Sequence, residues 1–120
     1  TDRNILIMGD KDHILRTFNN LLKNAIEATE DAEKCIIKIS LRNDNFDAYV
    51  DVEDNGKGIE QTFYGNIFTP NFTTKSSGTG LGLAFVKQAV ENAGGTVKFS
   101  STINRGTVFS LTFPIVGYTI

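Results

Sequence analysis

The sequence of 120 residues has no tryptophan, one cysteine, one histidine and two prolines. A single cysteine cannot form an internal disulfide. Cys35 lies in the strand-like run Cys35-Ile36-Ile37, so we expect it to be buried and unreactive in a reducing compartment. His13 has no cluster of cysteines or carboxylates at ligand spacing around it. This argues against a zinc site and favours a surface position at the start of a helix.

Long apolar runs and a strong charge of one sign are also lacking. No segment approaches the length of a membrane span, and the first residues do not resemble a signal peptide. The net charge is −2 and the signs are interspersed, so we expect neither nucleic acid nor a membrane as a partner. The composition suits one globular domain over residues 1–120. Because the chain begins with Thr1 and enters an apolar run almost at once, we expect it to be a piece of a longer protein.

Glycine, in contrast, is not scarce: the chain has 11 glycines, and three of them lie close together. Three glycines alternate in Gly78-Thr79-Gly80-Leu81-Gly82, directly before residues that predict a helix from about 80 to 93. Glycines let backbone N–H groups approach an anion, and a helix N-terminus adds unpaired N–H groups and the positive end of its dipole. The stretch is therefore typical of a phosphate-binding loop, although most glycine-rich segments are simple turns.

An earlier segment predicts a long amphipathic helix with two stripes. Apolar side chains recur at three- and four-residue steps and form a stripe that faces a core: Ile14, Phe18, Leu21, Leu22, Ala25 and Ile26. Beside it lies a second, polar stripe of Asn20, Asn24 and Glu27. Asparagine is a mediocre helix former, so two of them one turn apart favour a functional site as much as a solvated flank.

The next segment predicts an antiparallel hairpin. Apolar residues alternate with polar ones around 35–41 and again around 48–53, and Asn43-Asp44-Asn45 forms the turn. The alternation places Asp54 on the core face, where a carboxylate needs a partner. The turn Asn55-Gly56-Lys57-Gly58 would leave room beside Asp54 for a flat ligand, although a plain Asp-Asn-Gly turn remains the alternative.

The rest of the chain completes the expected architecture. Residues 60–79 form a long irregular segment with several aromatic residues, which we expect to be a lid that is mobile without a ligand. Two strands follow the second helix, with a turn at Asn104-Arg105-Gly106. The order β-α-β-β-loop-α-β-β predicts a two-layer α/β sandwich, with helices on one face of a mostly antiparallel sheet.

Four segments together resemble the sequence boxes of sensor histidine kinases. Residues 20–28 resemble the N box, 54–59 the G1 box, 67–75 the F box and 78–83 the G2 box, in the order of that family. By this resemblance, the chain is identified as a catalytic ATP-binding domain of the superfamily that also contains gyrase and heat-shock chaperone ATPases. The resemblance implies the Bergerat-type fold, with a mostly antiparallel mixed sheet.

The resemblance also implies a set of residues that bind ATP and Mg²⁺. They are Asn20, Asn24, Asp54, Gly56, Gly58, Lys75, Gly78, Thr79, Gly80, Leu81, Gly82 and Thr107. Asn24 would be the Mg²⁺ ligand, and Asn20 a polar contact nearby. Asp54 would accept a hydrogen bond from the adenine amine, with Thr107 sharing its water network and Gly56 and Gly58 giving the base clearance. The glycine-rich segment 78–82 and Lys75 would contact the phosphates.

The implied reaction is transfer of the γ-phosphoryl group of ATP to a histidine. This chain would supply no catalytic residue beyond those that position ATP, because His13 lacks the pattern of the family's phosphoacceptor. The implied partners are a histidine-containing dimerisation domain and, indirectly, a response regulator. The implied location is the cytoplasm, with the membrane status of the parent protein left open. Phe68 and Phe72 would be free to dock on a helical partner, although Asn71 departs from the usual F box aromatic.

Three other functions stay open within the same fold. A clamp ATPase or a serine kinase of this superfamily usually carries an acidic residue where this chain has Asn20, which disfavours efficient hydrolysis. A regulatory module that binds nucleotide without catalysis is the third, and the four intact boxes argue against it.

Overall fold

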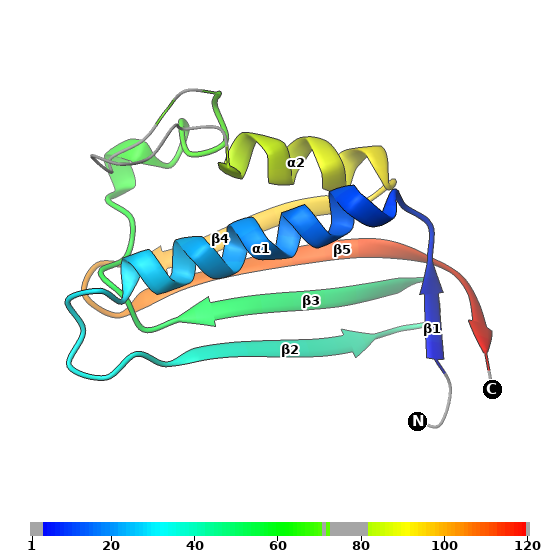
Figure 1. Cartoon of the computed structure of the whole chain (residues 1–120), viewed down its shortest axis with the longest axis horizontal. Coiled ribbons are helices and arrows are strands. Elements are labelled where there is room, and N and C mark those ends of the chain that lie inside the picture. Colours follow the sequence, from blue (N-terminus) through cyan, green and yellow to red (C-terminus); the bar gives the residue numbers. More distant parts are fainter. Residues whose placement is uncertain (1–3, 71, 73–81, 120) are drawn as a thin grey trace.

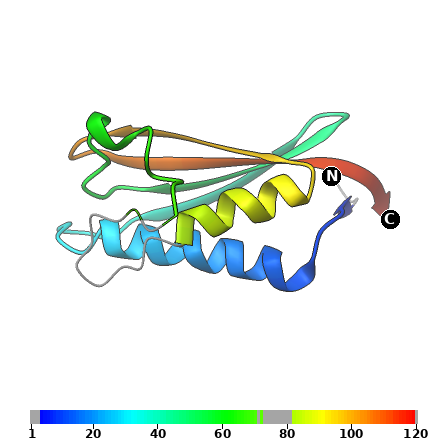
Figure 2. The ribbon, with the colours of Figure 1, turned by 90° about the horizontal axis from the view of Figure 1, so that it is seen from above.

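The computed structural model describes residues 4–70, 72 and 82–119. Its elements are β1 (Asn4–Ile7), α1 (Lys11–Ala28), β2 (Ile37–Asn43), β3 (Asp47–Asp54), the short 3-10 helix η1 (Gln61–Phe63), α2 (Gly82–Asn92), β4 (Thr96–Thr102) and β5 (Gly106–Thr119). The two helices lie side by side on the same face of one sheet (Figures 1 and 2). This confirms the predicted two-layer α/β sandwich.

The long strand β5 organises the sheet. It pairs with β3, β4 and β1, and β3 pairs in turn with β2, which gives the order β1-β5-β3-β2 with β4 beside β5. All these pairings are antiparallel. The resemblance implied a mostly antiparallel mixed sheet, and the described sheet contains the antiparallel pairings alone. The strand β2 therefore stands at one edge (Figure 1).

Local sequence signals set the ends of both helices. The Asp10 side chain accepts a hydrogen bond from the His13 N–H at 3.1 Å and caps α1. Gly94 has a φ of +83° after α2, and the Gly94 and Gly95 N–H groups donate to Glu91 and Val90. This is the Schellman motif, which a glycine permits at low cost. The second helix thus ends at Asn92, close to the predicted end at about residue 93.

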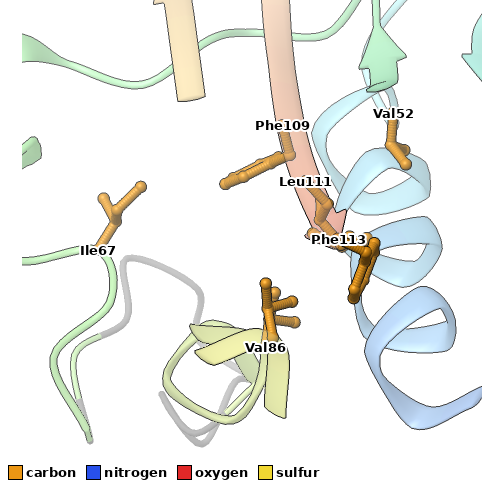
Figure 3. Close-up of a cluster of buried hydrophobic side chains, with 8 residues drawn as sticks. Val52, Ile67, Val86, Phe109, Leu111 and Phe113 are labelled. Carbon is orange, nitrogen blue, oxygen red and sulfur yellow. The ribbon is translucent and has the colours of Figure 1, made fainter. Parts of the chain in front are cut away.

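The core lies between the helices and the inner face of the sheet. Its fully buried members come from α1, β3, α2 and β5, joined by Ile67 from the irregular segment: Leu21, Val52, Ile67, Val86, Val90, Phe109, Leu111 and Phe113 (Figure 3). Alternate residues of β5 point into this core, which fixes the register of the central strand.

Two expectations about burial are wrong. Cys35 is exposed and lies before the start of β2, where its sulfur contacts the Thr29 hydroxyl at 3.1 Å. Ile26 belongs to the apolar stripe by spacing, yet it is 59% exposed. Ile26 lies on the side of α1 away from α2, while α1 packs mainly on α2 and β3, and Cys35 lies in the connection between α1 and β2.

Candidate nucleotide-binding site

The polar stripe of α1 faces the beginning of α2. The Asn20 side-chain amide donates a hydrogen bond to the Gly82 carbonyl at 3.2 Å, which ties the middle of α1 to the first residue of α2. Asn24 lies one turn further along the same side and is half-buried. The stripe is therefore an inter-helix surface rather than a solvated flank, and it adjoins the C-terminal end of the glycine-rich segment.

Asp54 ends β3 with its side chain on the inner face of the sheet, as the alternation predicted. The residue is only 7% exposed, and its Oδ1 accepts a hydrogen bond from the Gly56 N–H at 2.8 Å. Burial raises the pKa of this carboxyl group above its ordinary value. The N–H groups of Gly56 and Thr107 lower the pKa by smaller amounts, and the nearby charge of Glu53 raises it slightly further. Such a buried acceptor, only partly compensated, is suited to a ligand that donates a hydrogen bond.

Thr107 lies directly opposite Asp54 in the sheet and is also buried. Its hydroxyl lies 2.8 Å from the Ser101 hydroxyl, and the Ser101 oxygen accepts a hydrogen bond from the Ile59 N–H at 2.8 Å. Ser101 thus joins Thr107 to the turn after Asp54. The sequence reasoning did not include Ser101 in the site, although its place opposite Thr107 on β4 could have indicated it.

Gly56 and Gly58 are required by close approaches of the backbone. A Cβ at Gly56 would collide with the carbonyl of Ala28 at the end of α1. Gly58 has a φ of +78°, and a Cβ there would meet the Thr102 carbonyl at 2.5 Å. The Lys57 N–H donates to the Ala28 carbonyl at 3.0 Å, so the turn is fastened to the helix. These contacts explain both glycines without reference to clearance for a base.

The helix α1 connects the two groups of residues. Its C-terminal residue, Ala28, touches the turn after Asp54, and Asn20, eight residues earlier, touches the first residue of α2. At about 1.5 Å per residue these two points lie about 12 Å apart along the helix. Asn24 falls midway between them. An elongated ligand lying along this side of α1 would meet the Asp54 turn at one end and the start of α2 at the other.

The first half of the segment 60–79, which we expect to be a lid, packs on the sheet in this structure. Phe68 lies against Phe99 and Phe109, with ring centroids 6.0 and 6.3 Å apart, and Phe72 lies 5.5 Å from Phe63. The Tyr64 hydroxyl donates to the Ser101 carbonyl at 2.9 Å. In this structure Phe68 packs on β4 and β5 and Phe72 on the segment itself, and the docking of these rings on a partner stays a prediction.

The outer contact between the helices was not anticipated from the sequence. The Arg16 guanidinium lies over the Phe85 ring at 4.1 Å, and the His13 ring meets the same ring edge-on at 5.6 Å. His13 is exposed in the first turn of α1, as predicted. One aromatic side chain on α2 thus holds two residues of α1 and supports the Asn20 contact one turn further on.

Five of the residues implied for the site lie outside the described part of the chain: Lys75, Gly78, Thr79, Gly80 and Leu81. Within residues 4–70, 72 and 82–119 there is no group of three His, Cys, Asp or Glu side chains that could hold a metal. An Mg²⁺ ion bound through the Asn24 amide would thus take most of its oxygen ligands from phosphate and water, which suits this ion.

A hollow of about 220 Å³ near Asp54 overlaps this site only in part. It is lined by residues from the ends of β3, β4 and β5, namely Glu53, Asp54, Ser100, Ser101, Thr102, Arg105, Gly106, Thr107 and Val108. Glu53, Ser100 and Val108 belong to the face of the sheet away from the helices, because they alternate with inward residues. Three of the lining residues, Asp54, Ser101 and Thr107, also belong to the candidate site.

The chain is similar to known proteins over most of its length. Residues 9–117 match the family described as histidine kinase-, DNA gyrase B-, and HSP90-like ATPase. Sporulation kinase D of Bacillus subtilis is 37% identical over 115 residues, which cover 96% of this chain and 22% of that protein. The sensor histidine kinase ZraS of Escherichia coli K12 is 38% identical over 109 residues, covering 91% of this chain and 23% of that protein.

A solved structure extends the comparison to three dimensions. The catalytic domain of the histidine kinase ThkA superposes with a TM-score of 0.78 at 35% identity, covering 90% of this chain and 71% of that one. This chain therefore spans less than a quarter of the two full-length relatives but most of a catalytic domain. None of the helices in the described part of the chain is both long enough and apolar enough to cross a membrane.

Proposed function

Because this chain belongs to the family of histidine kinase-, DNA gyrase B- and HSP90-like ATPases, we propose that it binds Mg-ATP and donates the γ-phosphoryl group to a histidine on a separate dimerisation domain. The observation that carries the proposal is the polar side of α1, which runs from the turn after Asp54 to the start of α2. A nucleotide laid along it would have its base at Asp54 and its phosphates at the glycine-rich segment.

Each residue of the proposed site has a role that suits its chemistry. Asp54 accepts a hydrogen bond from the adenine amine, and Thr107 and Ser101 hold the polar network beside it. The Asn24 amide oxygen ligates Mg²⁺, which when bound offsets the charge of the phosphates. Asn20 positions Gly82, and Lys75 together with segment 78–82 contacts the phosphates through N–H groups. Phosphoryl transfer needs placement and charge neutralisation more than covalent help, so none of these residues acts as a nucleophile.

Within the family, the kinase function is favoured over the other two enzymatic functions. Both relatives compared above are named as kinases, one for sporulation and one as a sensor histidine kinase. A clamp ATPase or serine kinase would be helped by a carboxylate at position 20 to activate water or a hydroxyl, whereas this position holds an amide that is bonded to Gly82. An amide cannot take up a proton, so hydrolysis by this chain alone should be slow.

The proposed setting is two-component signalling in the cytoplasm. The partners would be a dimerisation domain that carries the acceptor histidine and, beyond it, a response regulator. Both would lie outside residues 1–120.

The test is transfer of radiolabel from γ-labelled ATP to a purified dimerisation domain of a related kinase. We expect acid-labile, base-stable label on a histidine of that domain only when this chain and Mg²⁺ are present. Asn24→Ala should abolish the labelling, and Asn19→Ala, on the exposed side of the same helix, should leave it unchanged. Rapid hydrolysis of ATP with no label on any histidine would contradict the proposal and favour a clamp ATPase.

A further inference from the structure

The strand β2 leaves an apolar strip of the sheet uncovered. Ile39 and Leu41 lie opposite Val52 and Val50, so their side chains share the inner face with the core. Yet Ile39 is 55% and Leu41 66% exposed, whereas Val52 is 1% exposed. Ile39 and Leu41 are more exposed than Val52 because α1 lies over β3 and α2 over β4 and β5. The edge strand β2 lies to the side of both helices (Figure 1).

The same residues present their backbone to the open edge. The Asn55 N–H donates to the Ile36 carbonyl and the Asp44 N–H to the Asp47 carbonyl, which sets the hydrogen-bonded pairs of this hairpin at even positions of β2. Ile37, Ile39 and Leu41 therefore direct their N–H and C=O groups away from β3. In the described sheet no strand lies beyond them. A row of backbone N–H and C=O groups that face an open sheet edge can pair with another strand.

The helix supplies a wall beside this edge. Leu15, Leu22 and Ile26 are spaced by seven and four residues and so share one side of α1. That side is opposite Asn20, which contacts α2, and it therefore lies toward β2. Leu15 and Ile26 are 56% and 59% exposed. A strand added to β2 would place alternate side chains against Ile39, Leu41 and this wall.

Charge determines which strand fits. The outer face of β2 carries Lys38, Ser40 and Arg42, and the facing residues of β3 are Glu53, Asp51 and Tyr49. On this face β3 thus carries acidic residues and β2 carries basic ones. A strand added beside β2 would continue this alternation of charge if its residues on the same face were acidic. A second copy of β2 would bring four cations together on this face, so the edge is protected against pairing with itself.

We propose that β2 is an interaction surface that binds an extended segment of a partner protein as an added strand, with apolar residues alternating with acidic ones. The apolar residues would cover Ile39, Leu41 and the wall of α1. The acidic residues would face Lys38 and Arg42. Main-chain hydrogen bonds to residues 37, 39 and 41 would give affinity, and the alternation would give specificity.

A short fluorescein-labelled peptide that alternates valine and glutamate tests this surface by fluorescence anisotropy. We expect it to bind at least about tenfold more tightly than the same peptide with lysine in place of glutamate, and to weaken as salt is added. Hydrogen exchange should slow at the amides of Ile37, Ile39 and Leu41, while those of Lys38, Ser40 and Arg42, already bonded to β3, change little. Equal binding of the two peptides, or no protection at residues 37, 39 and 41, would overturn the proposal.

Two variants separate the edge from general loss of structure. Ile39→Pro removes an N–H group that β3 does not use, so the fold and ATP binding should persist while peptide binding is lost. Should that variant unfold, the double variant Lys38→Glu, Arg42→Glu keeps the strand and should reverse the preference toward the lysine peptide. Val116→Thr, at an exposed position on β5, should bind as the unsubstituted chain does. A dimer in sedimentation that Ile39→Pro dissociates would instead assign the edge to a second copy and overturn the proposed partner.

Discussion

Asp54 is subject to opposing demands of folding and binding. Its burial raises the pKa of the carboxyl group above the ordinary value of 3.8, so the folded chain holds the proton more tightly than the unfolded chain. The contribution of this group to stability is therefore fully present below the unfolded pKa and is lost as the pH rises through the folded pKa. Above the folded pKa the ionised side chain costs stability, and a ligand that donates a hydrogen bond to it would recover some of that cost.

Asp54→Asn should separate these two effects. The amide oxygen can still accept the Gly56 N–H, so at pH 7 we expect a melting temperature higher by on the order of a few degrees, and no gain below the unfolded pKa. ATP binding should weaken by about 1–3 kcal/mol, because the amide nitrogen that replaces one carboxylate oxygen is a donor and cannot accept a hydrogen bond from the adenine amine. Calorimetry and thermal unfolding across pH check this, with Asp47→Asn on the outer face as control. A lower melting temperature at pH 7 would contradict it.

Asn24 gives a second prediction at the scale of one side chain. Removing its amide in Asn24→Ala should abolish the Mg²⁺-dependent part of ATP affinity, a loss of at least about tenfold, while the free energy of unfolding changes by less than about 1 kcal/mol. The change in stability is small because the residue is half-buried beside the apolar stripe and does not fill the core. Titrations with ATP in Mg²⁺ and in EDTA measure the difference. Full Mg²⁺ enhancement in the variant would rule out the ligand role.

At the scale of elements, regular alternation was the reliable guide. The hairpin of β2 and β3 placed Asp54 inward because side chains alternate with a period of two, and no tertiary contact had to be known for that. The polar stripe of α1 followed from helical spacing in the same way. Spacing alone could not say that this stripe meets Gly82, since the contact joins residues 62 positions apart.

Burial at the edge of the sheet was beyond prediction from periodicity. Ile26, Ile39 and Leu41 have the pattern of core residues, but their exposure depends on how far α1 reaches across the sheet. The aromatic residues of the irregular segment had no period to interpret, so their packing on Phe99 and Phe109 became visible only in the structure. Gly56 shows a third limit, because its contact is with Ala28, which is distant in sequence.

The anchoring of residues 60–70 leads to a prediction for this element. The Tyr64 hydroxyl bonds the Ser101 carbonyl, and Ser101 also supports the turn after Asp54. Tyr64→Phe should therefore lower the free energy of unfolding by about 1 kcal/mol and weaken ATP binding as well. Tyr49→Phe removes a comparable hydroxyl bond, to Asp44 at the far end of β3, and should spare ATP binding.

Hydrogen exchange without nucleotide tests the same anchor. The amides of Phe63, Tyr64, Asn66 and Thr69 donate to backbone carbonyls within the segment and should be protected in the free chain. Tyr64→Phe should make these amides exchange faster than in the unsubstituted chain. Exchange as fast as in an unstructured peptide would mean that this half of the segment is mobile after all, as the sequence pattern first indicated.

For the whole molecule, α1 acts as a rigid connection between the two ends of the proposed site. The turn after Asp54 is fastened to Ala28, and the start of α2 is fastened to Asn20, so both ends are positioned by one helix that packs on the core. A ligand that spans them gains from this preorganisation, since neither end must be ordered separately. In the proposed site, adenosine would reach only one end, and triphosphate alone only the other.

The nucleotide should therefore protect both ends together. At a concentration 100 times its dissociation constant, Mg-ATP should raise the free energy of unfolding by about 2.7 kcal/mol and slow exchange both at residues 55–59 and in the first turn of α2. Adenosine should protect the first region only, and GTP, which lacks the adenine amine, should leave residues 55–59 unprotected and protect the start of α2 less than Mg-ATP does at the same concentration. Measurement by mass spectrometry on one preparation makes the comparison direct. Protection by Mg-ATP at the start of α2 alone, equal to that by GTP, would remove Asp54 from the site while leaving phosphate binding in place.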